Sequence, residues 1–239
     1  MLKKPSLLFA IAGCWYGLCT AVSAQTRSQV YGDELTKQAQ TLFLRADTGM
    51  TTFESKVADS KETQPTSRYT VGGWAGEARL VGGQFTTEGE TVHFDLNNSD
   101  AKIAFQDLRM LVRIGWLMPS LGLSFADIGV TQEQTELVGL YSTGVSAGLN
   151  LAIPLYYRLV VSGDAMTVRS NKTYDKLGLG TKLVQRDEFD ANIAFDLTER
   201  IVDLLVGYRV RRFTLANEEQ SFGELSQGAY AGLRFGIYF

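Results

Sequence analysis

The chain has one histidine, His93, which lies in the segment Thr91-Val92-His93-Phe94-Asp95. Side chains alternate between the two faces of an extended strand, so His93 and Asp95 would share a face. A histidine beside a carboxylate can activate a water molecule or a hydroxyl group for attack on a substrate. This pair is the catalytic candidate of the sequence. A histidine with a structural role is the favoured interpretation, because a catalytic motif needs its structural context.

The residue types offer little support for other chemical centres. The chain has two cysteines, Cys14 and Cys19, near its N-terminus, and it has no second histidine. Metal sites in proteins are built mainly from clustered histidine, cysteine and carboxylate ligands, so we expect no metal and no cofactor. The formal net charge of −3 argues against a nucleic-acid partner, which would require a basic surface.

A larger set of charged residues alternates with apolar residues. In the segment 202–211, for example, Val206 and Tyr208 alternate with Arg209 and Arg211. This period of two predicts strands with one apolar and one polar face. The charges that we place on polar faces are Arg45, Arg109, Arg113, Arg158, Asp164, Glu188, Asp190, Asp196, Asp203, Arg209, Arg211 and Arg234.

The last ten residues show the clearest alternation. One face carries Ala231, Leu233, Phe235, Ile237 and Phe239. This segment resembles the closing strand of Gram-negative outer-membrane β-barrel proteins, in which the terminal aromatic residue and the alternating apolar residues are recognised by the assembly machinery. The resemblance implies an all-β fold: a single antiparallel transmembrane β-barrel in the outer membrane. It also implies that Leu233, Phe235, Ile237 and Phe239 form the assembly signal, and that membrane lipid, lipopolysaccharide and the barrel assembly machinery are partners.

The N-terminus predicts export. Lys3 and Lys4 precede an apolar run, and Val22-Ser23-Ala24 supplies the small residues of a cleavage site, so residues 1–24 are expected to be a signal peptide. A lipobox at Ile11-Ala12-Gly13-Cys14 is the alternative, which we disfavour because the residues after Cys14 stay apolar. Residues 25–40 would be a periplasmic N-terminal segment and residues 41–239 the barrel.

Two other folds fit parts of the pattern. The segment Leu137–Tyr157 carries no formal charge and is long enough for a transmembrane helix. It contains three glycines and Pro154, however, which are poor helix formers, and a strand that ends in a turn at Ile153-Pro154-Leu155 is favoured. A soluble β-sandwich would show the same alternation, and the export signal and the terminal strand favour the barrel.

Ten strands are favoured and eight remain possible. The earlier strands lie around 42–50, 73–80, 92–96, 109–116 and 121–125, with turns between Gly82 and Glu90 and near Met118-Pro119. The expected outer loops are 55–67, 97–100, 127–136, 170–182 and 216–226. An even strand number with both termini in the periplasm is typical of bacterial barrels.

Three functions follow from this fold. The first is a non-catalytic barrel with a structural role or a docking role toward another envelope protein. The second is a narrow channel, in which the arginine excess of 202–215 would favour anions. The third is an outer-membrane hydrolase that uses His93, although its surroundings match no signature of omptin-like proteases or lipid A deacylases. The first is favoured because side chains fill a barrel of about eight strands.

Overall fold

The computed structural model describes residues 42–55, 60–75, 80–94, 99–132, 135–156, 158–198, 201–217 and 220–237. The expected signal peptide, the segment 25–40, Asp95 and Phe239 lie outside this part of the chain. No helix in the described ranges is long and apolar enough to cross a bilayer.

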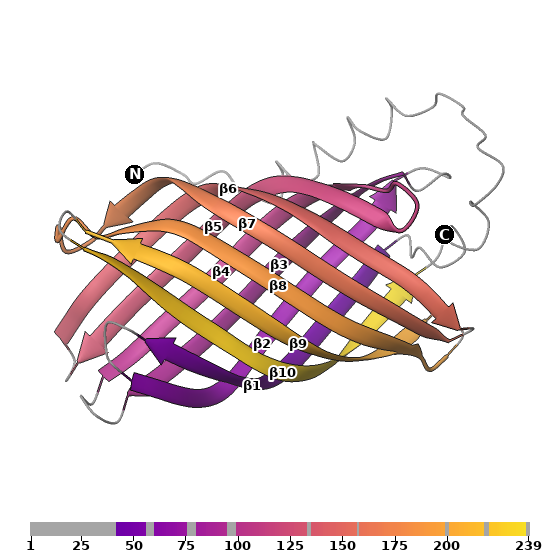
Figure 1. Cartoon of the computed structure of the whole chain (residues 1–239), viewed down its shortest axis with the longest axis horizontal. Coiled ribbons are helices and arrows are strands. Elements are labelled where there is room, and N and C mark those ends of the chain that lie inside the picture. The colour runs from indigo at the N-terminus through magenta and orange to yellow at the C-terminus, as the bar shows by residue number, and fades with distance from the viewer. Residues whose placement is uncertain are drawn as a thin grey trace, which may run out of the picture.

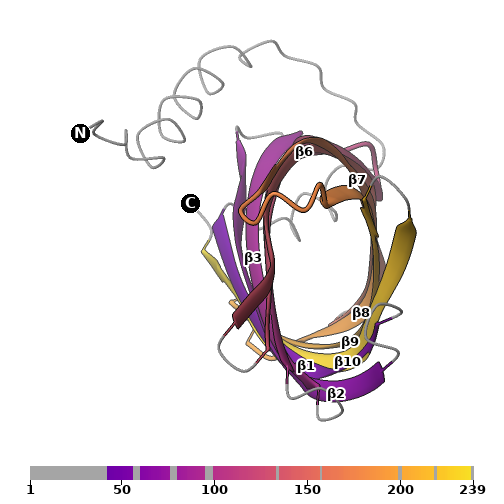
Figure 2. The ribbon, with the colours of Figure 1, turned by 90° about the vertical axis from the view of Figure 1, so that its left-hand side faces the viewer.

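Ten antiparallel strands form one closed barrel, in which each strand pairs with its sequence neighbours and the first pairs with the last (Figures 1 and 2). The strands are β1 (Leu42–Ser55), β2 (Ser60–Ala75), β3 (Val81–Phe94), β4 (Ser99–Val112), β5 (Leu117–Gln132), β6 (Thr135–Tyr156), β7 (Leu159–Asp175), β8 (Lys182–Asp196), β9 (Val202–Ala216) and β10 (Ser221–Ile237). This confirms the predicted all-β barrel and the favoured strand count. The helix over 137–157, the sandwich and the eight-strand count are wrong.

Closure gives every strand two hydrogen-bonded neighbours. Backbone amide and carbonyl groups find no water inside a bilayer, so a sheet can cross it only without open edges. Leu42 of β1 pairs with Ile237 of β10, and both therefore lie at the same end of the barrel. We call the half of the barrel at this end the membrane half, and the opposite half the outer half.

In the membrane half, apolar side chains face outward and charged ones face the lumen. On β9, Val206 is 55% exposed, whereas Leu205 beside it is 1% exposed. Arg209 and Arg211 on the same strand are buried inside the barrel. The same arrangement holds on β10, where Leu233, Phe235 and Ile237 are exposed. This is the predicted arrangement for a barrel surrounded by lipid.

In the outer half, the arrangement is reversed. On β4, Met110 and Val112 face outward near the membrane end, but Lys102 is the outward residue farther along and Ile103 is buried. On β9, Arg212 faces outward next to the buried Phe213. The strands contain 14 to 22 residues, whereas about 9–11 suffice to cross a bilayer. The outer half therefore extends beyond the lipid and, like a soluble protein, keeps most of its apolar side chains inside, although Tyr141 and Val184 are exposed.

This reversal corrects several predicted faces. Val92 and Phe94 were expected on the apolar outer face, but both are buried in the lumen, and His93 between them faces outward. Their position in the outer half explains the change, because water surrounds the barrel there. Trp74 also faces inward, although it lies in the membrane half, and packs with Leu111 and Met118 near the lumen wall.

Most strands are longer than predicted. Strand β3 runs through the expected turn at 82–90, and β2 covers most of the expected loop at 55–67. Met118 and Pro119 lie in β5, and the turn before it contains Gly115, whose φ of 62° suits glycine. Pro154 lies in β6 beside a register shift, where proline is tolerated. The loops at 127–136, 170–182 and 216–226 also lose residues to strands.

Replacing Val206 with arginine should therefore destabilise the barrel much more than Thr214→Arg on the same face of β9. We expect a loss of about 2–4 kcal/mol for Val206→Arg, because its side chain faces lipid near mid-depth. Thr214 lies in the outer half next to the natural Arg212, so Thr214→Arg should change stability by less than about 0.5 kcal/mol. Urea unfolding of the barrel in lipid vesicles measures both, and equal losses would contradict the two-half arrangement.

Candidate functional site in the barrel lumen

The lumen of the outer half is filled by an apolar cluster, which we call the apolar plug. Its buried members are Phe53, Val92, Phe94, Ala101, Ile103, Phe105, Ala126, Ile128, Leu140, Leu183 and Phe213. Phe213 lies at its centre, with ring centroids 6.0 Å from those of Phe53 and Phe105. Seven strands contribute to the plug, so it joins opposite walls of the barrel and leaves little room for water.

A network of buried charges lies next to the plug, toward the membrane half. We call it the charge network; it consists of Arg45, Asp47, Arg68, Glu88, Glu90, Glu188, Asp190, Arg209 and Arg211. Arg209 contacts four carboxylates: Asp47 at 2.9 Å, Asp190 at 3.1 Å, Glu88 at 3.3 Å and Glu188 at 3.9 Å. Arg211 pairs with Glu88 and Glu188. Each arginine thus ties together strands from different parts of the wall.

Two further ion pairs cross the lumen over the inner faces of β5 and β6. Arg109 of β4 donates two hydrogen bonds to Asp164 of β7, at 2.9 and 2.6 Å. Arg186 of β8 pairs with Asp107 of β4 and lies over the Phe105 ring at 4.3 Å. The inward residues of β5 and β6 at this level are small, among them Ser124 and Ser146, so long side chains can reach across them.

Tyr230 completes the charge network from β10. Its hydroxyl donates to Asp190 at 2.6 Å and accepts a hydrogen bond from Arg45 at 2.9 Å. The opposite residue on β9 is Gly207, where an added Cβ would lie 2.5 Å from the Tyr230 hydroxyl oxygen. Glycine at this position therefore makes room for the ring.

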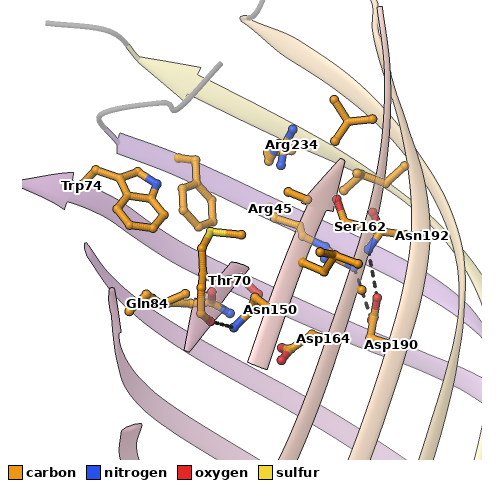
Figure 3. A pocket seen from close by; sticks show the side chains of 18 of the residues that line it. Arg45, Thr70, Trp74, Gln84, Asn150, Ser162, Asp164, Asp190, Asn192 and Arg234 are labelled. Carbon is orange, nitrogen blue, oxygen red and sulfur yellow. Dashed lines mark hydrogen bonds and ion pairs between the residues drawn. The ribbon is translucent and has the colours of Figure 1, made fainter. Parts of the chain in front are cut away.

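A cavity of about 180 Å³ lies below the charge network, in the membrane half. Trp74, Phe43, Leu111 and Met118 line one part of it. The polar lining comprises Arg45, Arg68, Thr70, Gln84, Arg113, Asn150, Ser162, Asp164, Asp190, Asn192 and Arg234. In Figure 3, labelled side chains of the lining enter the same space from opposite walls, with Trp74 and Gln84 on one side and Ser162 and Asn192 on the other.

The structure places the predicted charges at different depths. Arg45, Glu188, Asp190, Arg209 and Arg211 belong to the charge network, and Arg109 and Asp164 form the pair above β5 and β6. Arg234 and Asp203 form an ion pair of 2.7 Å closer to the barrel end, and Arg113 lies 4.2 Å from the centre of the Trp74 ring. Arg158 lies in the turn between β6 and β7, and the Asp196 carboxylate accepts a hydrogen bond from the Thr198 amide in the turn after β8.

Sequence reasoning missed four of the nine residues of the charge network. Glu88 and Glu90 lie in the expected turn between Gly82 and Glu90, and Asp47 and Arg68 were not assigned to the lumen. The same holds for Asp107 and Arg186, which form the separate ion pair. A signal was present in β2, where Thr66, Arg68 and Thr70 alternate with Ser67, Tyr69 and Val71. That alternation is the pattern of a strand. It is hard to recognise, because the outward residues Ser67, Tyr69 and Val71 have a modest hydropathy as a set.

His93 lies on the outer surface of the outer half. Its side chain is 53% exposed, and its Nδ1 lies 2.7 Å from a carboxylate oxygen of Asp100 on the neighbouring strand. The expected partner Asp95 lies outside the described residues. Among the residues that the structure describes, no group of three or more histidine, cysteine or acidic side chains could hold a metal ion.

Loss of one partner from the Arg109–Asp164 pair should destabilise the barrel strongly. Asp164→Asn leaves the buried Arg109 guanidinium without its counter-charge, and we expect a loss of about 3–5 kcal/mol. The double variant Arg109→Met/Asp164→Leu should recover most of it, because no buried charge remains. Asp203→Asn is the control, since its partner Arg234 is partly exposed. Urea unfolding of the barrel measures the stability that each variant loses. If the double variant loses as much as the separate replacements of Arg109 and Asp164 added together, the two residues are not coupled.

Replacing His93 with alanine should leave the lipid A profile and surface protease activity of the cells unchanged. His93 lies on the outer wall, where its exposed contact with Asp100 has the structural role of linking two strands, so its loss should change neither activity. Mass spectrometry of lipid A and cleavage of a fluorescent peptide measure the two activities. Loss of either one in a variant that still folds would revive the hydrolase hypothesis.

Comparisons with known proteins found distant structural likenesses only. No family model matches this sequence, and no curated protein matches it. Its structure is similar to Neisserial surface protein A (14% identity, TM-score 0.45, 83% of this chain and 99% of that chain). It is also similar to the translocator domain of the autotransporter NalP from Neisseria meningitidis (14%, 0.44, 96% and 97%) and to the outer membrane protease OmpT from Escherichia coli (10%, 0.42, 83% and 94%).

These likenesses are too distant to carry an argument about activity. The barrel's own features are a closed antiparallel sheet, an apolar band around the membrane half and charges inside it. With these features, the chain has the fold of a membrane-spanning β-barrel.

Proposed function

We propose that this protein is a non-catalytic, non-conducting barrel with a structural or docking role in the cell envelope. The observation that carries the proposal is the apolar plug, which fills the outer half of the lumen across seven strands. An ion that crossed the barrel would lose its water in this layer, at a large cost in free energy. The charge network adds a second closed layer, in which each arginine already has carboxylate partners.

The charged lumen alone would also fit a narrow channel. A selective channel needs charges that an ion can exchange for its water, without holding the ion or blocking its path. Each arginine of the network instead contacts several protein carboxylates. An ion that passed the charge network would then meet the apolar plug, because both fill the lumen along the barrel axis. The closed barrel is therefore the better proposal.

The outer end offers a surface that could serve a docking role. The end of β7 exposes Tyr174, and the turn between β7 and β8 exposes Leu177 and Leu179. The Asp175 carboxylate accepts hydrogen bonds from the backbone amides of Leu177 at 3.0 Å and Thr181 at 3.1 Å. Desolvation raises the pKa of Asp175, but the backbone hydrogen bonds together outweigh it and lower the pKa. The turn therefore holds its apolar side chains in a fixed conformation at neutral pH.

The native barrel should show no ion-conducting steps in a planar lipid bilayer. Phe213→Ala should produce intermittent conductance, because removing the central ring leaves a gap through the plug that water can enter. Phe189→Ala is the matched control: its ring faces outward, so this variant should stay closed. Regular conductance steps from the native protein at neutral pH would contradict the proposed closed state.

A further inference from the structure

The cavity below the charge network is a blind pocket that opens at one end of the barrel. Its lining comes from all ten strands and includes the inward residues nearest to the end where Leu42 and Ile237 pair. In a bacterial outer-membrane barrel, both termini lie in the periplasm, so this end faces the periplasm. The charge network and the plug close the other side. A molecule in this pocket would therefore enter from the periplasm and leave the same way.

The polar lining carries an excess of positive charge. It contains four arginines and two aspartates, a formal charge of +2. Both aspartates are already engaged by arginines: Asp164 accepts two hydrogen bonds from Arg109, and Asp190 contacts Arg68 and Arg209. The carboxylates therefore offer little to a cationic ligand.

Two of the lining arginines keep hydrogen-bond donors for a ligand. Arg45 uses its Nε for Asp47 and its Nη2 for Tyr230, and Arg234 uses its Nε and Nη2 for Asp203. Within the described residues, the Nη1 atoms of both arginines make no hydrogen bond. Both side chains are partly exposed, at 17% and 29%. Guanidinium groups of this kind bind carboxylates and phosphates well.

The remaining wall of the pocket is apolar. Trp74 packs with Leu111 and Met118, and Phe43 lies on the neighbouring strand. The volume of about 180 Å³ sets the size of the ligand. An engineered apolar cavity of about 150 Å³ accepts benzene, so one ring with a small substituent fits here. An anionic group near the arginines and an apolar body against Trp74 would satisfy both parts of the lining.

We propose that this pocket binds a small organic carboxylate of about the size of one aromatic ring, taken up from the periplasm. The inference goes beyond the closed, non-conducting barrel and does not depend on it. A conducting barrel could still bind the carboxylate, and a closed barrel could lack the site. The two proposals therefore fail in different experiments.

Benzoate and benzamide are the matched probes, because they share the ring but only benzoate carries a charge. Isothermal titration of the folded barrel in detergent should give saturable binding of benzoate, and at least tenfold weaker binding of benzamide. Inorganic phosphate, which lacks the apolar body, should also bind at least tenfold more weakly than benzoate. Equal affinity for benzoate and benzamide, or no saturable benzoate signal, would overturn the proposal.

Variants locate the site. Arg234→Gln and Arg45→Gln should each weaken benzoate binding at least tenfold, whereas Arg212→Gln should leave it unchanged, because Arg212 faces outward in the outer half. Trp74→Leu should also weaken binding and should remove benzoate quenching of the tryptophan fluorescence. If Trp74→Leu fails to fold, the arginine variants decide. Equal benzoate affinity in the native protein, Arg234→Gln and Arg45→Gln would overturn the assignment of the pocket.

Discussion

The structure depends on one constraint: at each depth, a side chain that points out of the barrel must suit the solvent at that depth. The closed ladder of ten strands satisfies the backbone everywhere, so it leaves the choice of face to the side chains. Lipid surrounds the membrane half, so apolar residues such as Val206 and Met110 face outward there. Water surrounds the outer half, so charged residues such as Lys102 and Arg212 face outward there. The strands keep their alternation throughout, and the apolar set changes face between the two halves.

The contents of the lumen follow from the same constraint. Charges excluded from the lipid face gather inside the membrane half, where they are far from bulk water and must pair with one another. Apolar residues excluded from the water-facing wall gather inside the outer half as the plug. The lumen is thus closed by two layers of opposite character. Only the part nearest the end where Leu42 pairs with Ile237 remains hollow, and four arginines line it.

The sequence was sufficient where a strand lies in the membrane half. The faces of β8, β9 and β10 were predicted correctly. Their lipid-facing positions carry apolar residues, such as Phe189, Val206 and Phe235, which alternate clearly with polar residues. It was insufficient for Val92 and Phe94, because period-two spacing does not tell whether lipid or water lies outside. Much of β3 was missed for a related reason: at Glu88 and Glu90, charge marks a lumen position, whereas a turn was expected between Gly82 and Glu90.

Partners within the site could not be predicted either. Arg209 contacts Asp47 because β9, β10 and β1 are neighbours in the closed barrel, although the two residues are far apart in sequence. Site-directed spin labelling along β9 tests the central claim most directly, since both cysteines lie in the expected signal peptide. Labels at 204, 206, 208 and 210 should be accessible to oxygen in lipid, and labels at 212 and 214 to a water-soluble nickel reagent. Oxygen accessibility that continues unchanged to 214 would contradict the reversal.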